Sequence, residues 1–311
     1  MLISVIIPVF NAKKYLGRCL KSVLTALQSS GCSGEILLID NGSSDGSLEV
    51  IKQFAKKYPK IVHMLYCHTP GAAAARNYGT TRAAGRYIWF VDADDTVAEA
   101  AISELVKTAE REKADLVMMG MERHYPDGHM DYLSAVDPSQ KDYKSRFVRY
   151  GMGPVQVLIR RAWWEKHKFL FREGIIHEDM ELMSALILYT DALAAADKPF
   201  YHYYQNPESV LHKSAWDPHY FDIFAALEGL YARFEEAGAI KLYHDELEWF
   251  FIWNLLIDSA RDFKKFPEGR AGLQKSREML NRYFPNWRKN KFLHQKPWRL
   301  RLRVLMNYFT S

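Results

Sequence analysis

Runs of apolar residues alternate with helical patterns through the N-terminal third of the chain, and this alternation limits the fold more than any other feature. Between the runs, apolar residues recur at helical spacing, most clearly from Tyr15 to Leu27. Four runs are apolar along most of their length, at residues 3–9, 35–40, 61–66 and 87–91. Strands without polar alternation are typical of a parallel sheet with helices on both faces. The sequence therefore predicts an α/β fold.

Polar residues follow three of these strands directly. Asn11 follows the first strand, Asp40 ends the second, and Asp92, Asp94 and Asp95 follow the fourth. The carboxyl ends of parallel strands meet at one edge of a sheet, where the ligands of such folds bind. We therefore expect a composite site at this edge. Asn11 is also a candidate cap for the first helix, and Asp95 is a candidate cap for the helix that follows it.

The turn after the first strand excludes two nucleotide-binding folds. A dinucleotide-binding Rossmann domain needs a glycine-rich turn there, and a phosphate-binding loop needs a Gly-Lys-Ser/Thr ending. The sequence Val9-Phe-Asn-Ala-Lys-Lys has neither, and the next glycine is Gly17. Carboxylates counter the charge of a diphosphate only through a divalent cation, and oxygen ligands of this kind suit Mg²⁺ or Mn²⁺. Asp92 and Asp94 are therefore predicted to hold a metal that binds a diphosphate.

The composition agrees with a large globular chain in a reducing compartment. With 311 residues, 48% of them hydrophobic, the chain is long enough for one large or two modest domains. Its three cysteines are too few and too widely spaced for a disulfide framework or a zinc site. The N-terminal segment lacks the basic start of a secretion signal, and no apolar run reaches the roughly 20 residues that span a bilayer. We expect a cytoplasmic protein, either free or peripheral on the inner face of the plasma membrane.

Basic residues gather toward the C-terminus. Residues 261–311 hold 14 of the 42 lysines and arginines but 3 of the 37 acids. Between Asn286 and Arg303, seven basic residues and no acids interleave with large apolar side chains. This pattern favours contact with an anionic membrane surface, whereas nucleic acid is not expected because no companion motif is present. The alternative is a solvated helix that packs four apolar side chains on the body: Trp298, Leu302, Leu305 and Phe309.

Four motifs occur in order along residues 3–117. They are Ser4-Val-Ile-Ile-Pro-Val-Phe-Asn, Ile39-Asp-Asn-Gly-Ser-Ser-Asp-Gly, Gly71-Ala-Ala-Ala-Ala-Arg-Asn-Tyr-Gly and Ala84-Gly-Arg-Tyr-Ile-Trp-Phe-Val-Asp-Ala-Asp-Asp. In this order they resemble glycosyltransferase family 2. A weaker resemblance continues at Phe171-Arg-Glu-Gly-Ile-Ile-His-Glu-Asp and at Lys198-Pro-Phe-Tyr-His-Tyr-Tyr-Gln-Asn. The resemblance implies a GT-A fold, a Rossmann-like, mostly parallel sheet flanked by helices, that inverts the anomeric carbon of a nucleotide-sugar donor.

The resemblance also implies a division of the chain. Residues 1–205 are expected to form the GT-A domain, with a nucleotide-binding half at 1–117 and an acceptor-side half at 118–205. Residues 206–311 are expected to form a helical C-terminal region that ends in the basic amphipathic tail. The aromatic and leucine stripe in residues 219–260 is more typical of a core than of a binding surface.

By the same resemblance, individual residues receive roles in donor binding. Pro8, Phe10, Asp40 and Arg76 are expected to hold the nucleotide, together with Asp92. Asp94 is expected to ligate the metal, with Asp92 as a second ligand. An aromatic ring and a carboxylate suit uracil, which offers a stacking face and an N–H donor, so the expected carrier is UDP.

Asp179 is the candidate catalytic base. An inverting transfer is a single in-line displacement, so one carboxylate must take the proton of the acceptor hydroxyl while the metal stabilises the leaving diphosphate. Glu178 is the alternative base. The structural reading is that both acids only begin a helix, where acids are favoured by the helix dipole. His212, in a later loop, is a further candidate contact to the diphosphate or the metal, although a single loop histidine is more often a surface residue.

Two departures from the family pattern concern the reaction. Many members have a second Asp at the position of Asn41. The Gln-x-x-Arg-Trp signature of processive synthases is missing, which favours the addition of one hexose per event to a glycan or lipid-linked acceptor in surface polysaccharide synthesis. Two other functions stay open from the sequence. One is a non-catalytic partner subunit that binds nucleotide-sugar or glycan, and the other is a nucleotidylyltransferase, which would need a glycine- and arginine-rich loop that is absent here.

Overall fold

The computed structural model describes residues 1–206 and 215–309, and these form two compact units. The first unit comprises residues 1–141, 152–174 and 189–209, and the second comprises residues 142–151, 175–188 and 210–311. We describe each unit by itself. Among the described residues, no helix combines the length and the apolar character needed to cross a membrane.

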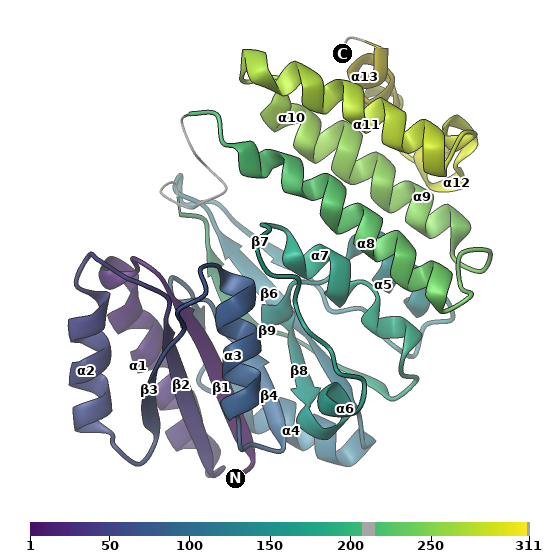
Figure 1. The fold of residues 1–311 in the computed structure, drawn as a ribbon. Coiled ribbons are helices and arrows are strands. Elements are labelled where there is room, and N and C mark those ends of the chain that lie inside the picture. Colours follow the sequence, from purple (N-terminus) through teal and green to yellow (C-terminus); the bar gives the residue numbers. More distant parts are fainter. Residues whose placement is uncertain (207–214, 310–311) are drawn as a thin grey trace. The chain divides into compact units, whose positions relative to one another are not determined.

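The first unit is built on one mixed sheet with strand order β3-β2-β1-β4-β8-β6-β9-β5, and β7 pairs with β6 (Figure 1). Its first four strands are parallel, as their apolar sequences predicted, and β8 joins β4 and β6 as an antiparallel neighbour. The strands are β1 (Ile3–Val9), β2 (Gly34–Asp40), β3 (Val62–Tyr66), β4 (Tyr87–Phe90), β5 (Thr96–Val97), β6 (Leu116–His124), β7 (Met130–Leu133), β8 (Val157–Arg160) and β9 (Leu193–Tyr204).

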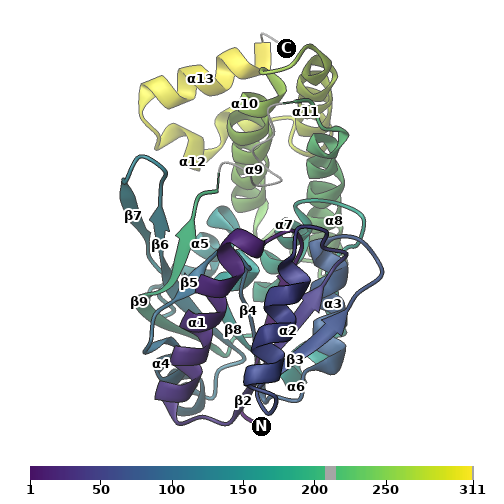
Figure 2. The same cartoon turned by 90° about the vertical axis from the view of Figure 1, so that its left-hand side faces the viewer.

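Helices cover both faces of this sheet (Figure 2). On one face α1 packs against α2 and α4, and on the other face α3 lies on β1 and β2 while α6 lies on β8. The helices are α1 (Lys13–Ser30), α2 (Ser47–Lys57), α3 (Ala72–Arg82), α4 (Ala101–Glu112) and α6 (Arg161–Lys166). Helix α3 begins with four alanines and lies very close to β1: a Cβ atom added to Gly79 would be 2.4 Å from a methyl carbon of Ile6. The predicted α/β fold with a helical C-terminal region is confirmed.

The second unit is helical. It consists of α5 (Tyr143–Tyr150), α7 (Glu178–Met183), α8 (Asp222–Glu236), α9 (His244–Trp253), α10 (Ser259–Phe263), α11 (Arg270–Tyr283), α12 (Lys291–His294) and α13 (Trp298–Phe309). The predicted aromatic core is present, since Phe224, Phe234 and Phe251 are fully buried. The two units divide the expected acceptor-side half, because α5 packs on α9 and α7 packs on α8.

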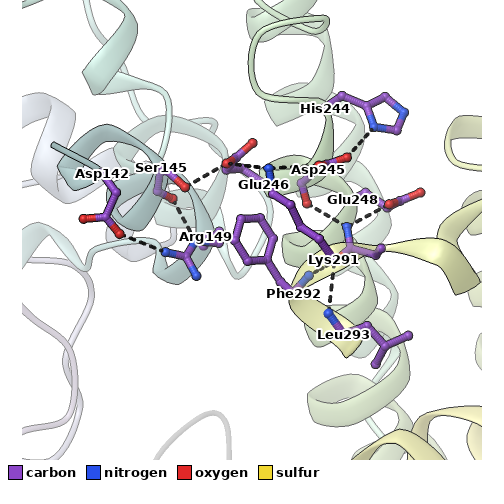
Figure 3. A network of polar contacts seen from close by, with 11 residues as sticks. Asp142, Ser145, Arg149, His244, Asp245, Glu246, Glu248, Lys291, Phe292 and Leu293 are labelled. Carbon is purple, nitrogen blue, oxygen red and sulfur yellow. Dashed lines mark hydrogen bonds and ion pairs between the residues drawn. The ribbon is translucent and has the colours of Figure 1, made fainter. Parts of the chain in front are cut away.

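Polar contacts also hold α5, α9 and α12 together (Figure 3). Ser145 Oγ donates to Glu246 Oε1 at 2.7 Å, and the guanidinium of Arg149 lies 4.1 Å from the ring centroid of Phe292. Asp245 forms an ion pair with Lys291 at 2.9 Å. Segment 142–151 thus contributes a helix to the second unit although it lies between strands β7 and β8 in the sequence.

The local structure differs from the sequence prediction in two places at the sheet edge. Asn11 does not cap α1, which begins at Lys13 without a side-chain cap. Instead, Asn11 adopts a left-handed conformation (φ 49°) and its Oδ1 accepts a hydrogen bond from Ser44 N at 2.8 Å. Asp95 does not cap α4 either, because strand β5 follows it directly and α4 begins at Ala101. Asparagine tolerates the left-handed region better than most residues, which explains its place in this turn.

Candidate active site

The carboxyl ends of β1 and β2 place Phe10 and Asp40 on adjacent strands. Val9 pairs with Asp40 in the parallel register, and Pro8 pairs with Ile39. Pro8 is half-buried, whereas the Phe10 ring, just past the strand, is 58% exposed. A large exposed aromatic ring beside a strand-end carboxylate provides a stacking surface for a planar ligand.

Asp40 is a buried acid with an unused oxygen. The residue is 4% exposed, and its Oδ2 accepts a long hydrogen bond, 3.4 Å, from Gly42 N. Its Oδ1 is buried and has no hydrogen-bond partner among the described residues. A buried acceptor without a donor costs about 1–3 kcal/mol. A ligand with an N–H group at this position would satisfy this oxygen.

The loop after β2 is fixed by Asn41, the residue at which this chain departs from many family members. Its amide Nδ2 donates to Cys67 O at 3.0 Å and to Thr69 O at 2.7 Å. Its Oδ1 accepts from Gly71 N at 2.7 Å, directly before α3. A carboxylate has no hydrogen to donate, so an aspartate could not make the first two bonds. Asn41 therefore joins the ends of β2 and β3 to the start of α3.

Arg76 and Asp92 form an ion pair across the site. Arg76 Nη2 lies 2.9 Å from Asp92 Oδ1, and Arg76 is buried whereas the Asp92 side chain is 36% exposed. The guanidinium also lies 5.6 Å from the ring centroid of Phe171. The structure thus brings together two of the residues expected to bind the nucleotide. Asp92 keeps an open side from which it can contact a ligand.

Asp94 is half-buried and feels the negative charge of Asp92. Burial, and then the negative charge of Asp92, raise the pKa of the Asp94 carboxyl. Arg18 Nη2 donates to the main-chain oxygen of Asp94 at 2.7 Å rather than to its carboxylate. Within residues 1–206 and 215–309, Asp92 and Asp94 do not form a three-ligand group with a further His, Cys, Asp or Glu. Two crowded carboxylates fit a Mg²⁺ or Mn²⁺ ion that takes its remaining ligands from substrate phosphates and water.

Asp95 has a role that the sequence did not suggest. It is fully buried, and its two oxygens accept hydrogen bonds from Tyr201 Oη at 2.7 Å and from Tyr204 N at 2.8 Å. Burial, followed by the charges of Asp92 and Asp94, raises the pKa of Asp95 to about 8. Tyr201 also accepts a hydrogen bond from Asp92 N at 3.1 Å. No local pattern identifies Tyr201, because its partners are 106 and 109 residues away.

Asp179 and Glu178 form the first turn of α7 in the second unit. Glu178 is buried, while Asp179 is half-buried and its Oδ1 accepts from Met180 N at 2.9 Å. The preceding His177 has a left-handed backbone (φ 68°). Since Asp94 belongs to the first unit, the assignment of Asp179 or Glu178 as the base stays a prediction. His212 lies outside the described residues.

Comparison with known proteins agrees with this geometry. A sequence model described as glycosyl transferase family 2 matches residues 4–169. The "Uncharacterized glycosyltransferase EpsJ" of Bacillus subtilis is 28% identical over 256 residues, which are 77% of this chain and 72% of that protein.

Two solved structures share the fold. S. aureus TarS residues 1–349 in complex with UDP-GlcNAc has a TM-score of 0.76 at 19% identity, over 99% of this chain and 89% of that one. The mannosyltransferase PcManGT from Pyrobaculum calidifontis, in complex with GDP-Man and Mn²⁺, has a TM-score of 0.53 at 14% identity, over 99% of this chain and 87% of that one. These findings favour the transferase over the partner-subunit and nucleotidylyltransferase alternatives. The chain belongs to glycosyltransferase family 2, and it is a glycosyltransferase.

Proposed function

We propose that this enzyme transfers one sugar from a UDP-sugar donor to a hydroxyl group of a glycan or lipid-linked acceptor in surface polysaccharide synthesis. The observation that carries the proposal is the edge formed by the ends of β1, β2 and β4. There an exposed ring (Phe10), an unused buried carboxylate oxygen (Asp40 Oδ1) and two crowded acids (Asp92 and Asp94) occur in one compact unit.

The uridine part of the donor is supported by Phe10 and Asp40. Uracil has a planar face that stacks on an aromatic ring, and its N–H group can donate a hydrogen bond to Asp40 Oδ1. Arg76 holds Asp92 at 2.9 Å, which leaves the exposed side of Asp92 for the ribose or the metal. Of the relatives, TarS binds UDP-GlcNAc, so UDP-GlcNAc is the first donor to test.

The diphosphate is proposed to be held through a divalent ion, Mn²⁺ or Mg²⁺, at Asp94 and Asp92. The raised pKa of Asp94 means that its anion is costly where it lies, and a dication would offset this cost. The ion supplies charge stabilisation for the departing diphosphate. Asp179 is proposed to accept the proton of the attacking hydroxyl, with Glu178 as the alternative.

The experiment is a panel of UDP-sugars assayed for Mn²⁺-dependent hydrolysis and for transfer, starting with UDP-GlcNAc. We expect Asp94→Asn to reduce hydrolysis by about 100- to 1,000-fold, because it removes a ligand of the metal that stabilises developing charge. Asp179→Asn should reduce transfer by about 100- to 10,000-fold and leave UDP binding intact, as expected for the loss of a general base. Glu178→Gln tests the alternative base, and it should transfer normally if Asp179 is the base. Normal transfer by Asp179→Asn would contradict the base assignment.

The C-terminal helix supports contact with an anionic membrane. Four apolar side chains of α13 recur at spacings of four, four and three residues and therefore share one face: Trp298, Leu302, Met306 and Phe309. They are exposed, Trp298 by 66% and Phe309 by 65%, so three of the four side chains of the packing alternative lie in the open, and only Leu305 is half-buried. The opposite face is buried through Val304, Asn307 and Tyr308.

Arginines lie on both borders of this apolar face of α13. On a helical wheel, Arg301 falls on one border, and Arg299 and Arg303 fall on the other. An exposed apolar stripe bordered by cations suits the interface of an anionic bilayer, where the apolar side chains enter the acyl boundary and the arginines meet headgroups.

Sedimentation with vesicles tests this contact. The wild type should bind vesicles that contain phosphatidylglycerol and not pure phosphatidylcholine vesicles. The double substitution Trp298→Ser, Leu302→Ser should weaken binding at least about 10-fold. Leu242→Ser, which changes an exposed leucine outside α13, should bind like the wild type. Binding that does not depend on anionic lipid, or a dimer that dissociates in the double variant, would overturn the membrane assignment.

A further inference from the structure

Two histidines and a glutamate gather on one face of strands β6 and β9. Residues two apart on a strand share a face, as Glu122 and His124 do on β6. In the parallel pairing, Glu122 lies opposite His202, and His124 lies opposite Tyr204. The two strands are neighbours in the sheet of the first unit (Figure 1).

This pairing depends on an irregularity in the ladder. Up to Met119, β6 pairs with β9 in a register that would place Pro199 opposite Glu122. The register shifts on both sides of Gly120, and the shift brings His202 opposite Glu122 instead. Such bulges aim side chains at particular positions. Here the bulge completes a set of three side chains that all carry metal-binding atoms.

The distances between these atoms suit a small cation. Glu122 Oε2 lies 3.0 Å from His202 Nδ1 and 3.2 Å from His124 Nε2. The three ligand atoms all lie within 4.8 Å of one another. Bonds of about 2.0–2.2 Å to Zn²⁺ separate the ligands of a tetrahedral site by about 3.3–3.5 Å. A small movement of one side chain would therefore bring the three atoms to the required spacing.

The surroundings orient the ligands and leave access to them. The His124 ring stacks on Tyr204 at 4.5 Å, and the Arg18 guanidinium covers Tyr204 at 3.7 Å. His124 Nε2 is itself buried, yet the three side chains are partly exposed. His124, Tyr204 and Arg18 line a cavity of about 240 Å³ that Asp94 also lines. Of the three ligands, His124 lines this cavity, so the site has an open side there.

We propose that Glu122, His124 and His202 bind a transition-metal dication of the Zn²⁺ class, at a site separate from the diphosphate metal of Asp92 and Asp94. Two imidazoles and one carboxylate are borderline-soft ligands, which suit Zn²⁺ or Co²⁺ better than Mg²⁺. Three protein ligands leave a fourth position open for water or for a group in the cavity. The bound ion would cross-link β6 and β9, so that occupancy stabilises the first unit.

The test uses the full chain with Asp94→Asn, which removes the other site, after treatment with a chelator. Titration with Co²⁺ should give one equivalent and the intense visible absorption of a tetrahedral complex, and Zn²⁺ should abolish this absorption. The midpoint of thermal unfolding should rise with Zn²⁺. Addition of His202→Gln or His124→Gln should weaken Co²⁺ binding by at least about 100-fold, whereas His63→Gln on β3 should have no effect.

Several outcomes would overturn the proposal. One is the absence of a stoichiometric Co²⁺ complex in the Asp94→Asn protein. Another is Co²⁺ binding that stays unchanged in both histidine variants, since the ion would then lie elsewhere. Circular dichroism establishes that each variant is folded, and Glu122→Gln serves as a third ligand variant if either histidine variant is not.

Discussion

Buried acids of the two units differ in what surrounds them. In the helical unit, Glu181 is paired with Arg233 at 3.0 Å, and Glu248 accepts a hydrogen bond from Asn290 at 2.7 Å (Figure 3 shows the neighbourhood of Glu248). At the end of β4, by contrast, burial and then the charges of Asp92 and Asp94 raise the pKa of Asp95, and burial and then the charge of Asp92 raise that of Asp94.

The two kinds of surroundings predict opposite contributions to stability: the acids of the helical unit stabilise the folded protein, and the acids after β4 destabilise it. A buried acid with a cationic or amide partner in the same unit is costly to replace, because the partner then stays behind unsatisfied. An acid whose pKa is raised by other acids destabilises the folded protein when it is ionised. Neutralising substitutions should therefore have opposite effects on stability in the two regions.

The largest loss of stability is expected at Glu181. Glu181→Ala should lower the free energy of unfolding by about 3 kcal/mol, because Arg233 loses its partner in a partly buried position. Urea denaturation measures the loss. Glu165→Ala, which removes an exposed partner of Arg161, should change stability by less than about 0.5 kcal/mol. Equal losses in the two variants would contradict the distinction between the regions.

Asp95→Asn should act in the opposite direction. The folded carboxyl has a pKa of about 8, whereas the unfolded one titrates near 4, so the folded state binds more protons between these values. Stability of the wild type should therefore fall as the pH rises through this window. The asparagine variant lacks this dependence, so its gain in stability over the wild type should grow from none near pH 4 to as much as about 5 kcal/mol at pH 8. Unfolding without divalent cations across this range tests the prediction, and parallel pH profiles would refute it.

Asn41→Asp gives a smaller loss at the same edge of the sheet. The substitution removes the amide donors to Cys67 O and Thr69 O and places a carboxylate beside two carbonyls. We expect a loss of about 1–2 kcal/mol at neutral pH in thermal or urea unfolding. Lowering the pH should recover part of the loss, because the protonated acid can donate one hydrogen bond. If the Asp variant is as stable as the wild type, the hydrogen bonds from the Asn41 amide do not stabilise the protein.

The smallest effect is expected on the exposed face of α13. Trp298→Ser should change the free energy of unfolding by less than about 0.5 kcal/mol, because the side chain is exposed in the folded unit. Tyr308→Ala, on the buried face of the same helix, should cost about 3 kcal/mol. Chemical denaturation of the two variants distinguishes a binding face from a packed one. A large loss in Trp298→Ser would mean that the face stabilises the protein.

The sequence was informative where function and fold follow short-range patterns. Apolar runs predicted β1 to β4, helical spacing predicted α1, and the strand-end acids marked the edge at which Arg76 and Asp92 meet. Strand β8 begins only at Val157, because Pro154–Gln156 form a 3-10 turn before it. The sequence of β8 does not reveal that it pairs antiparallel with β4 and β6, because pairing depends on strands that are distant in the sequence.

Long-range contacts account for what the sequence did not reveal. The hydroxyl of Tyr201 reaches Asp92 and Asp95 from a strand that is distant in the sequence, and the histidine pair on β6 and β9 depends on a bulge. Neither leaves a periodic signal. The packing of α5 and α7 on the helical unit was likewise hidden, since both helices interrupt the strand-forming part of the chain.

The double hydrogen bond of Tyr201 has a consequence for how enzymes of this design can diverge. One phenol oxygen donates to Asp95 and accepts from the main chain of Asp92, so removal of the hydroxyl alters the positions of two acids in a single step. Replacing this tyrosine is therefore not a neutral route to a new donor preference. Substitutions that change the donor preference but keep the chemistry at the diphosphate should therefore occur at residues other than Tyr201, Asp92 and Asp95.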